Sequence, residues 1–169
     1  MRAWLLGLLL LCGCGYSSGF VLPEGNTTVG VEFFGNDSRL RNLEAELHGY
    51  LTDSLNRMVH ARLVAPDDAD YVIRGNVLEY ARRRGIRSPD NVRFETGVRI
   101  GARAQLWERD ATEEEPGLSL VRDNRFSSQS GYRLEDPQGE NDARDRVLRN
   151  LADEVVLDLF THLSLKQAP

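Results

Sequence analysis

The clearest pattern in the chain is a strict alternation of apolar and polar residues between positions 93 and 106. A period of two is the period of side chains along a β-strand. The pattern therefore predicts a long strand with one buried and one solvated face, as in an antiparallel sheet that is covered on a single side. The buried face is expected to contain Phe94, Thr96, Val98, Ile100, Ala102, Ala104 and Leu106.

Two other stretches repeat apolar residues at steps of three and four, which is the spacing of one face of an α-helix. The first follows a possible N-cap at Asp37 or Ser38, and the second follows one at Asn141. Both stretches predict amphipathic helices. The first apolar stripe contains Leu40, Leu43, Leu47, Tyr50, Leu51, Leu55 and Met58, and the second contains Val147, Leu148, Leu151, Ala152, Val155, Leu159 and Leu163.

Three further segments predict strands. Residues 28–34 and 71–80 are rich in β-branched and aromatic residues, whereas the alternation over 118–126 is weaker because polar residues interrupt it. Residues 127–140 predict a long loop. The expected order is strand, helix, strand, strand, strand, helix, with the first two strands parallel. We therefore expect an α+β fold with two helices packed on one face of a four-stranded mixed sheet.

The first residues form a secretory signal that ends at a cysteine. Arg2 precedes an apolar run that ends at Leu11, and the small residue Gly13 directly precedes Cys14. The run is too short to cross a bilayer as a helix. The spacing resembles the bacterial lipoprotein signal, which implies that Cys14 is lipidated and becomes the first residue of the mature protein. Cys12 is the alternative anchor, and a plain cleavable signal is the other interpretation.

The chain is expected to contain one domain behind this signal. Residues 1–13 are the lipoprotein signal peptide, 14–26 are the lipidated cysteine and a flexible tether rich in glycine and serine, and 27–165 form a single α+β domain. Gly15 stands at the position where an aspartate would signal inner-membrane retention. In this respect the chain resembles lipoproteins that are sorted to the outer membrane. We therefore expect a lipid-anchored protein on the periplasmic side of the outer membrane.

Composition and motifs favour binding over catalysis. The chain has a formal net charge of −5 at pH 7, which argues against nucleic-acid binding. It lacks an HExxH motif, a CxxC pair, a G-x-S-x-G elbow and a phosphate-binding glycine loop. We expect no cofactor, no metal site and no enzyme activity.

A cluster of arginines is the first candidate site. Arg82, Arg83 and Arg84 stand next to one another, and Arg87 follows in the turn expected between the second and third strands. Arginine is suited to bidentate contacts with phosphate or carboxylate groups. We expect these residues to bind the phosphates of a glycolipid, with Arg74 beside them on the solvated face of the preceding strand. A solvated turn that prevents edge-to-edge pairing and a contact with an acidic protein groove are the alternatives.

The solvated face of the long alternating strand is the second candidate site. It is expected to present three arginines with two glycines between them, at Arg93, Gly97, Arg99, Gly101 and Arg103. The glycines lower the surface, so that a partner protein can approach closely. We therefore expect this face to contribute to a protein contact, and an ordinary solvated face is the alternative.

The chain contains six short segments with a familiar pattern: Cys14-Gly15-Tyr16, Leu22-Pro23-Glu24-Gly25, Val29 to Asn36, Leu43 to Leu47, Leu63-Val64 and Ala69 to Val77. Together they resemble the LptE family of lipopolysaccharide-assembly lipoproteins. The order of the expected elements matches that family as well. The chain departs from it where the family often has His after the first Tyr and Gly before the Leu-Val pair, because Ser17 and Ala61 stand there.

The resemblance implies a non-catalytic role at the outer membrane. Such a protein sits partly inside the LptD barrel, helps the barrel to assemble and assists delivery of lipopolysaccharide to the outer leaflet. The alternatives are periplasmic lipoproteins that resemble the curli secretion subunit CsgG or the activators of cell-wall synthases. The former need an additional membrane-inserting segment, and the latter need a longer tether than residues 14–26 provide, so an outer-membrane partner is favoured.

We predict that Cys14→Ser abolishes palmitate labelling and releases the protein from membranes, because the Cys14 sulfur is the expected site of lipid attachment. Labelled palmitate and membrane fractionation measure the two effects. Cys12→Ser is the control and should leave both unchanged. Labelling that survives in Cys14→Ser but disappears in Cys12→Ser would move the anchor to Cys12.

Overall fold

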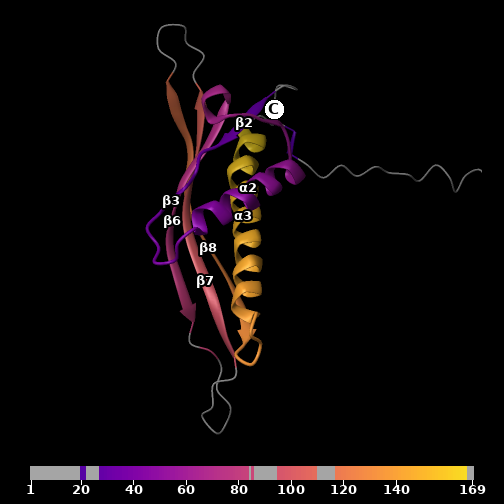
Figure 1. Cartoon of the computed structure of the whole chain (residues 1–169). Helices are drawn as coiled ribbons and strands as arrows, with labels where there is room; N and C mark the ends of the chain where they lie inside the picture. The colour runs from indigo at the N-terminus through magenta and orange to yellow at the C-terminus, as the bar shows by residue number, and fades with distance from the viewer. Residues whose placement is uncertain (1–19, 22–26, 84, 86–94, 110–116, 167–169) are drawn as a thin grey trace, which may run out of the picture.

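Three long strands and a long helix form the frame of the molecule. The computed structural model describes residues 20–21, 27–83, 85, 95–109 and 117–166. Neighbouring strands are antiparallel in the order β6 (Tyr71–Arg83), β7 (Glu95–Arg109), β8 (Leu118–Arg133). Figure 1 shows both α2 (Leu43–Met58) and α3 (Gly139–Lys166) on the same side of these strands. We call the side covered by helices the inner face, and the opposite side of β6, β7 and β8 the outer face.

The main sheet contains more strands than the four expected from the sequence. Its order is β5-β2-β6-β7-β8, and β3 also pairs with β6. The additional strands are two residues long, so no alternating pattern could predict them. They are β3 (Gly35–Asn36) and β5 (Arg62–Leu63), while β1 (Phe20–Val21) and β4 (Val59–His60) form a separate parallel pair. β1 lies within residues 14–26, the segment expected to be a tether.

The predicted parallel arrangement of the first two longer strands is confirmed. β2 (Thr28–Val31) pairs in parallel with the start of β6. However, α2 begins at Leu43, later than expected, because Asn36 and Ser38 stabilise a turn instead of capping the helix. The Ser38 backbone N–H donates to Asn36 Oδ1 (2.9 Å), and Asn36 Nδ2 donates to the carbonyl of Leu40 (2.9 Å).

β8 continues to Arg133, although the sequence predicts a loop from residue 127 onward. The two residues that interrupt its alternation, Arg122 and Asn124, face α3. Arg122 Nη2 donates to Asp158 Oδ1 (2.8 Å), and Asn124 Nδ2 donates to Asp158 Oδ2 (3.3 Å). Polar contacts with the helix therefore replace apolar ones at this end of β8, which explains why hydrophobic periodicity underestimates the strand.

A β-bulge in β6 decides which side chains reach the outer face. The pairing of β6 with β7 shifts by one residue between Val77 and Glu79. Because side chains alternate along a strand, the extra residue exchanges the faces of all later positions. Beyond the bulge, Arg82 pairs with Val98 on the inner face, and Arg83 pairs with Gly97 on the outer face.

The core between the sheet and the helices confirms the predicted apolar faces where they are described, while Phe94 lies outside the described residues. Its members have no more than about one per cent of their surface exposed, so they supply the main hydrophobic stabilisation. β7 contributes Val98, Ile100, Ala102, Ala104 and Leu106, α2 contributes Leu43, Leu47, Leu51 and Leu55, and α3 contributes Val147, Leu148, Leu151, Ala152, Val155 and Leu159.

A polar contact joins the two helices within this core. Ser54 of α2 is fully buried, and its Oγ donates to Asp153 Oδ1 of α3 at 2.5 Å. Arg57 Nη2 donates to the same carboxylate oxygen (2.7 Å). Because a buried hydroxyl is costly without a partner, this contact fixes how α2 and α3 lie against each other.

A side-chain clamp holds the start of the parallel pair. The backbone N–H and the hydroxyl of Thr28 donate to Asp70 Oδ2 at 2.8 and 2.7 Å, and the same hydroxyl accepts from the Asp70 N–H (2.9 Å). The hydrogen bond from the Thr28 hydroxyl, followed by the one from its backbone, lowers the pKa of Asp70 below the ordinary value. The ionised carboxylate is therefore the form that ties β2 to β6.

We predict that Asp70→Asn lowers the free energy of unfolding by about 1 kcal/mol at pH 7, because the charge-assisted hydrogen bonds to Thr28 are weakened. A carboxyl whose pKa is lower in the folded state stabilises above its unfolded pKa, about 3.9, and loses that contribution as the pH falls through the folded value. Denaturant unfolding at pH 7 and pH 3 should therefore show a smaller difference between variant and parent at pH 3. Asp68→Asn in the same turn is the control, and an equal deficit at both pH values would contradict the prediction.

Candidate functional site

The outer face of β6, β7 and β8 is a broad polar surface. Both helices lie on the inner side (Figure 1), so the outer face has no covering helix among the described residues. The whole outward row of β8 from position 123 onward is exposed, at Asp123, Arg125, Ser127, Gln129, Gly131 and Arg133. The solvated face predicted for β7 is thus continuous with a second solvated row on β8.

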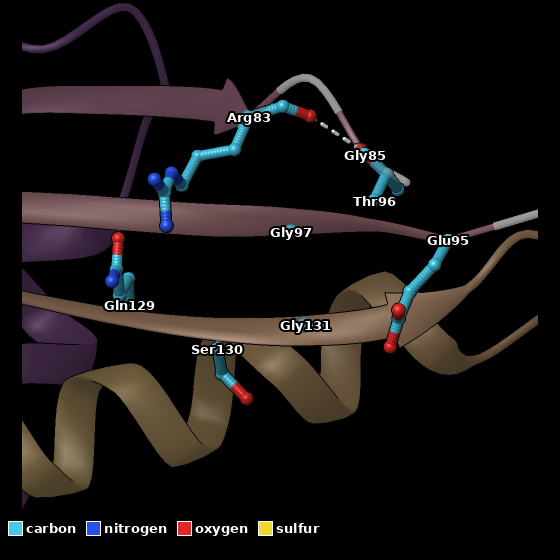
Figure 2. Close-up of a pocket in the computed structure, with 8 residues that line it drawn as sticks. All are labelled: Arg83, Gly85, Glu95, Thr96, Gly97, Gln129, Ser130 and Gly131. Atoms are coloured by element: carbon cyan, nitrogen blue, oxygen red, sulfur yellow. Dashed lines mark hydrogen bonds between the residues drawn. The ribbon is translucent and has the colours of Figure 1, made fainter. Parts of the chain in front are cut away.

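A hollow of about 420 Å³ lies on this face where β6 ends and β7 begins. Its floor is bare backbone, because Gly97 of β7 pairs directly with Gly131 of β8. Figure 2 shows Arg83 extending toward Gln129 at one end of the glycine pair and Glu95 at the other end. The hollow therefore places a cationic and an anionic group on either side of a low floor.

The two described arginines of the predicted phosphate cluster lie in β6 and not in the turn, and they point to opposite faces. Arg82 Nε donates to Glu140 Oε1 (2.9 Å) at the start of α3. Arg83 lies in the hollow and has no ion pair with another described residue. Arg84 and Arg87 lie outside the described residues. Within the described part of the cluster, Arg83 is therefore the residue that can receive a ligand.

Glu140 gathers the ends of β6 and β8 around the start of α3. Its carboxylate accepts hydrogen bonds from the hydroxyls of Tyr80 (2.7 Å) and Tyr132 (3.0 Å) in addition to Arg82. Burial alone would raise the pKa of Glu140, but these hydrogen bonds outweigh it and lower the pKa. Burial, followed by the bond to Glu140, raises the pKa of Tyr80. Arg82 is thus held by Glu140 within the fold and is not available to bind a phosphate.

Arg74 does not lie beside the other arginines, so this part of the prediction is wrong. Nine residues of β6 separate it from Arg83, which corresponds to about 30 Å along a strand. Its Nη2 is 2.6 Å from Glu32 Oε1, and its guanidinium lies 5.7 Å from the ring centroid of Trp107. Arg74 is therefore occupied by contacts within the fold.

The predicted protein-contact residues of β7 have unequal surroundings. Arg99 Nη2 is 2.5 Å from Glu79 Oε1, and the Glu79 side chain covers Gly101, where an added Cβ would lie 3.1 Å from Glu79 Cγ. Gly97, in contrast, forms the floor of the hollow. The lowered surface that the sequence predicts at both glycines is therefore found at Gly97, while Arg93 lies outside the described residues.

Arg103 is paired across the strands. Its Nε donates to Asp123 Oδ1 (2.8 Å), a second hydrogen bond joins its Nη2 to the other carboxylate oxygen, and Gln105 Nε2 also donates to Asp123 (3.0 Å). The hydrogen bonds from Arg103 and then Gln105 lower the pKa of Asp123 to about 2. The charge of Arg103 is thus largely compensated within the face.

Sequence reasoning missed the contribution of β8 to this surface. Arg125, Gln129, Gly131 and Arg133 fall in or beside the segment predicted as a loop, yet they complete the outer face next to β7. The period-two repeat of exposed residues continues through them, but both rows of β8 are largely polar, so the repeat carries no hydrophobic signal. Pairing with β7 is what reveals their common face.

A second hollow of about 390 Å³ lies at the opposite edge of the sheet, between α2 and the edge strands. Most of its lining is aliphatic. Near it, Phe33 is 69% exposed and stacks on His48 with ring centroids 4.2 Å apart and an interplanar angle of 9°. The lining residues are Val29, Val31, His48, Thr52, Leu63, Val64 and Ala65.

Two further properties concern the described residues alone. They contain no group of three or more histidine, cysteine, aspartate or glutamate side chains arranged to hold a metal ion. Neither α2 nor α3, the α-helices that are described, combines the length and the apolar composition needed to cross a membrane. The expected lipidation site, Cys14, lies outside the described residues.

Several solved structures share this fold. The hypothetical protein CT253 from Chlamydia trachomatis superposes with a TM-score of 0.59 and 11% identity, covering 83% of this chain and 99% of that chain. XCC0632 from Xanthomonas campestris superposes with a TM-score of 0.58 and 13% identity, covering 87% of this chain and 91% of that chain. PelC from Paraburkholderia phytofirmans, a dodecamer, superposes with a TM-score of 0.51 and 16% identity, covering 80% of this chain and 89% of that chain. At such identities the likeness shows the fold alone.

A search of curated protein sequences gave no match. In contrast, the family model LptE, described as lipopolysaccharide-assembly, matches residues 27–161. The matched region begins just before β2, ends within α3 and includes the three long strands. It therefore covers the three long strands and most of α3, and the resemblance seen in the sequence is confirmed. The chain belongs to the LptE family of lipopolysaccharide-assembly proteins.

Proposed function

We propose that this protein is an outer-membrane lipoprotein, anchored by lipid on the periplasmic side, that assists assembly of the LptD barrel and delivery of lipopolysaccharide to the outer leaflet. It acts by binding protein and glycolipid and not by catalysis. The observation that carries this proposal is the match to the LptE family model over residues 27–161. The expected lipid attachment at Cys14 supports the location, and the outer face, which neither of the described α-helices covers, provides a surface for partners.

We predict that the tagged full-length protein, purified from membranes of its native host, copurifies with a large outer-membrane barrel, because the proposed role requires a lasting contact with LptD. Mass spectrometry identifies the partner. An unrelated tagged lipoprotein of the same membrane is the control. Recovery of a cell-wall synthase or a curli-type secretion complex in place of the barrel would overturn the proposal in favour of the alternatives.

The glycolipid contact is assigned to the Arg83 end of the outer face. Arg83 is exposed, and unlike Arg74 and Arg82 it has no ion pair among the described residues, so it meets a phosphate without first losing a partner. Arg84 follows it directly in the sequence, and Arg87 comes three residues later. Forked guanidinium groups suit the several phosphates of a glycolipid. The proposed glycolipid site therefore contains Arg83, Arg84 and Arg87 and leaves out Arg74 and Arg82, which the sequence also suggested.

We predict that Arg83→Ser, combined with Arg84→Ser and Arg87→Ser, lowers the affinity for lipopolysaccharide at least about fivefold and weakens its salt dependence, because losing even one charge-assisted contact worth about 1 kcal/mol has an effect of that size. Binding to purified lipopolysaccharide is measured against salt concentration, and thermal stability should not change. Arg74→Ser, about 30 Å away on the same face, is the control and should bind normally. Unchanged affinity and salt slope in the triple variant would show that these arginines are ordinary solvated side chains and not a glycolipid site.

A further inference from the structure

Arginines outnumber carboxylates on the outer face, although the chain as a whole has a net charge of −5. Three of these arginines are neutralised locally by ion pairs to Glu32, Glu79 and Asp123. The arginines on this face that have no ion pair among the described residues are Arg83, Arg125, Arg133 and Arg109, of which Arg109 donates to the backbone carbonyls of Ala69 and Pro66. Glu95 lies directly across from Arg133 and offsets one of these charges. An excess of uncompensated positive charge on one face of an acidic protein is complementary to an acidic partner.

The spacing of the free arginines on β8 indicates what kind of partner fits. Arg125 and Arg133 are eight residues apart on the same side of one strand, which places them about 26 Å apart. A single glycolipid headgroup presents its charges close together, whereas an extended protein segment of about eight residues covers this distance. An extended protein segment therefore fits both arginines, while a headgroup fits one.

The surface between the two arginines allows such a segment to lie close to the sheet. Gly131 and Gly97 form the low floor of the hollow, and small or polar side chains, Ser127 and Gln129, occupy the rest of the β8 row. Absence of side chains at a glycine pair is what permits another backbone to approach a sheet surface. The positive charge of the arginines and the low floor at the two glycines thus both favour an extended protein segment with acidic side chains.

We propose that the outer row of β8 from Arg125 to Arg133 docks an extended segment of the partner protein that carries Asp or Glu side chains, with its backbone crossing the Gly97–Gly131 floor. This inference rests on the proposed function, because it describes the contact through which the barrel is bound. It assigns the protein contact to β8 and leaves Arg83, at the end of β6, for the glycolipid.

Two variants test the charge and the shape separately. Arg125→Glu with Arg133→Glu reverses the attraction, and Gly131→Val fills the floor. A Cβ at Gly131 would be no closer than 3.5 Å to its nearest neighbour, whereas one at Gly97 would lie 2.9 Å from the Ser130 carbonyl oxygen and strain the strand. Gly131 is therefore the position at which bulk can be added without distorting the sheet.

The full-length variants are expressed in the native host, and the barrel recovered with each is quantified by mass spectrometry. Each variant should recover at least about tenfold less barrel than the parent at unchanged thermal stability. The variant with Arg125→Glu and Arg133→Glu, which leaves the hollow around Arg83 unfilled, should also keep its lipopolysaccharide binding. Arg39→Glu with Arg41→Glu, in the exposed segment before α2, reverses the same number of charges and is the matched control.

A photoreactive residue at Ser127 then identifies the docked segment, and the crosslinked peptide should be rich in Asp and Glu. Unchanged barrel recovery in both variants, or a crosslinked peptide without acidic residues, would overturn the docking inference while the proposed function stands. Loss of lipopolysaccharide binding with normal barrel recovery would assign these arginines to the glycolipid instead. If the parent protein itself recovers no barrel, the proposed function fails together with this inference.

Discussion

The buried aliphatic row of β7 is the constraint on which the rest of the structure depends. Its side chains from Val98 to Leu106 have no exposed surface, and covering them requires the helices packed on the inner side. Because side chains alternate along a strand, burying this row forces the neighbouring row to the opposite face. The core and the candidate binding surface are thus two sides of the same strand, and a shift of one residue would exchange them.

The parts of the fold that could be predicted are those with a long hydrophobic repeat. The buried face of β7 and the apolar stripes of α2 and α3 could be predicted because their buried residues recur at the spacing of a strand or a helix. The two-residue strands are too short to show any period, and β8 is largely polar on both sides, with Phe126 and Tyr132 as exceptions on the inner face. Its strand is stabilised by the ladder with β7 and by the contact of Arg122 with Asp158, which only the tertiary structure brings together.

The candidate site could be predicted in kind but not in detail. The sequence indicates an arginine-rich surface with glycines, and this surface exists on the outer face. It does not indicate which arginines are already neutralised, since Arg82 meets Glu140 and Arg74 meets Glu32 only after folding. Neighbours in a sequence cluster also point to opposite faces once they lie in a strand. A ligand therefore encounters fewer free cations than composition suggests.

The bulge in β6 has a consequence for how this hairpin tolerates changes in chain length. Loss of one residue from β6 ahead of the arginines would move each of them to the opposite face. In the consecutive run Arg82-Arg83-Arg84, the next arginine would then take the vacated place. One guanidinium would still reach Glu140, and another would still lie over the glycine floor. The repetition of a single residue type therefore makes both contacts insensitive to the loss of one residue from β6.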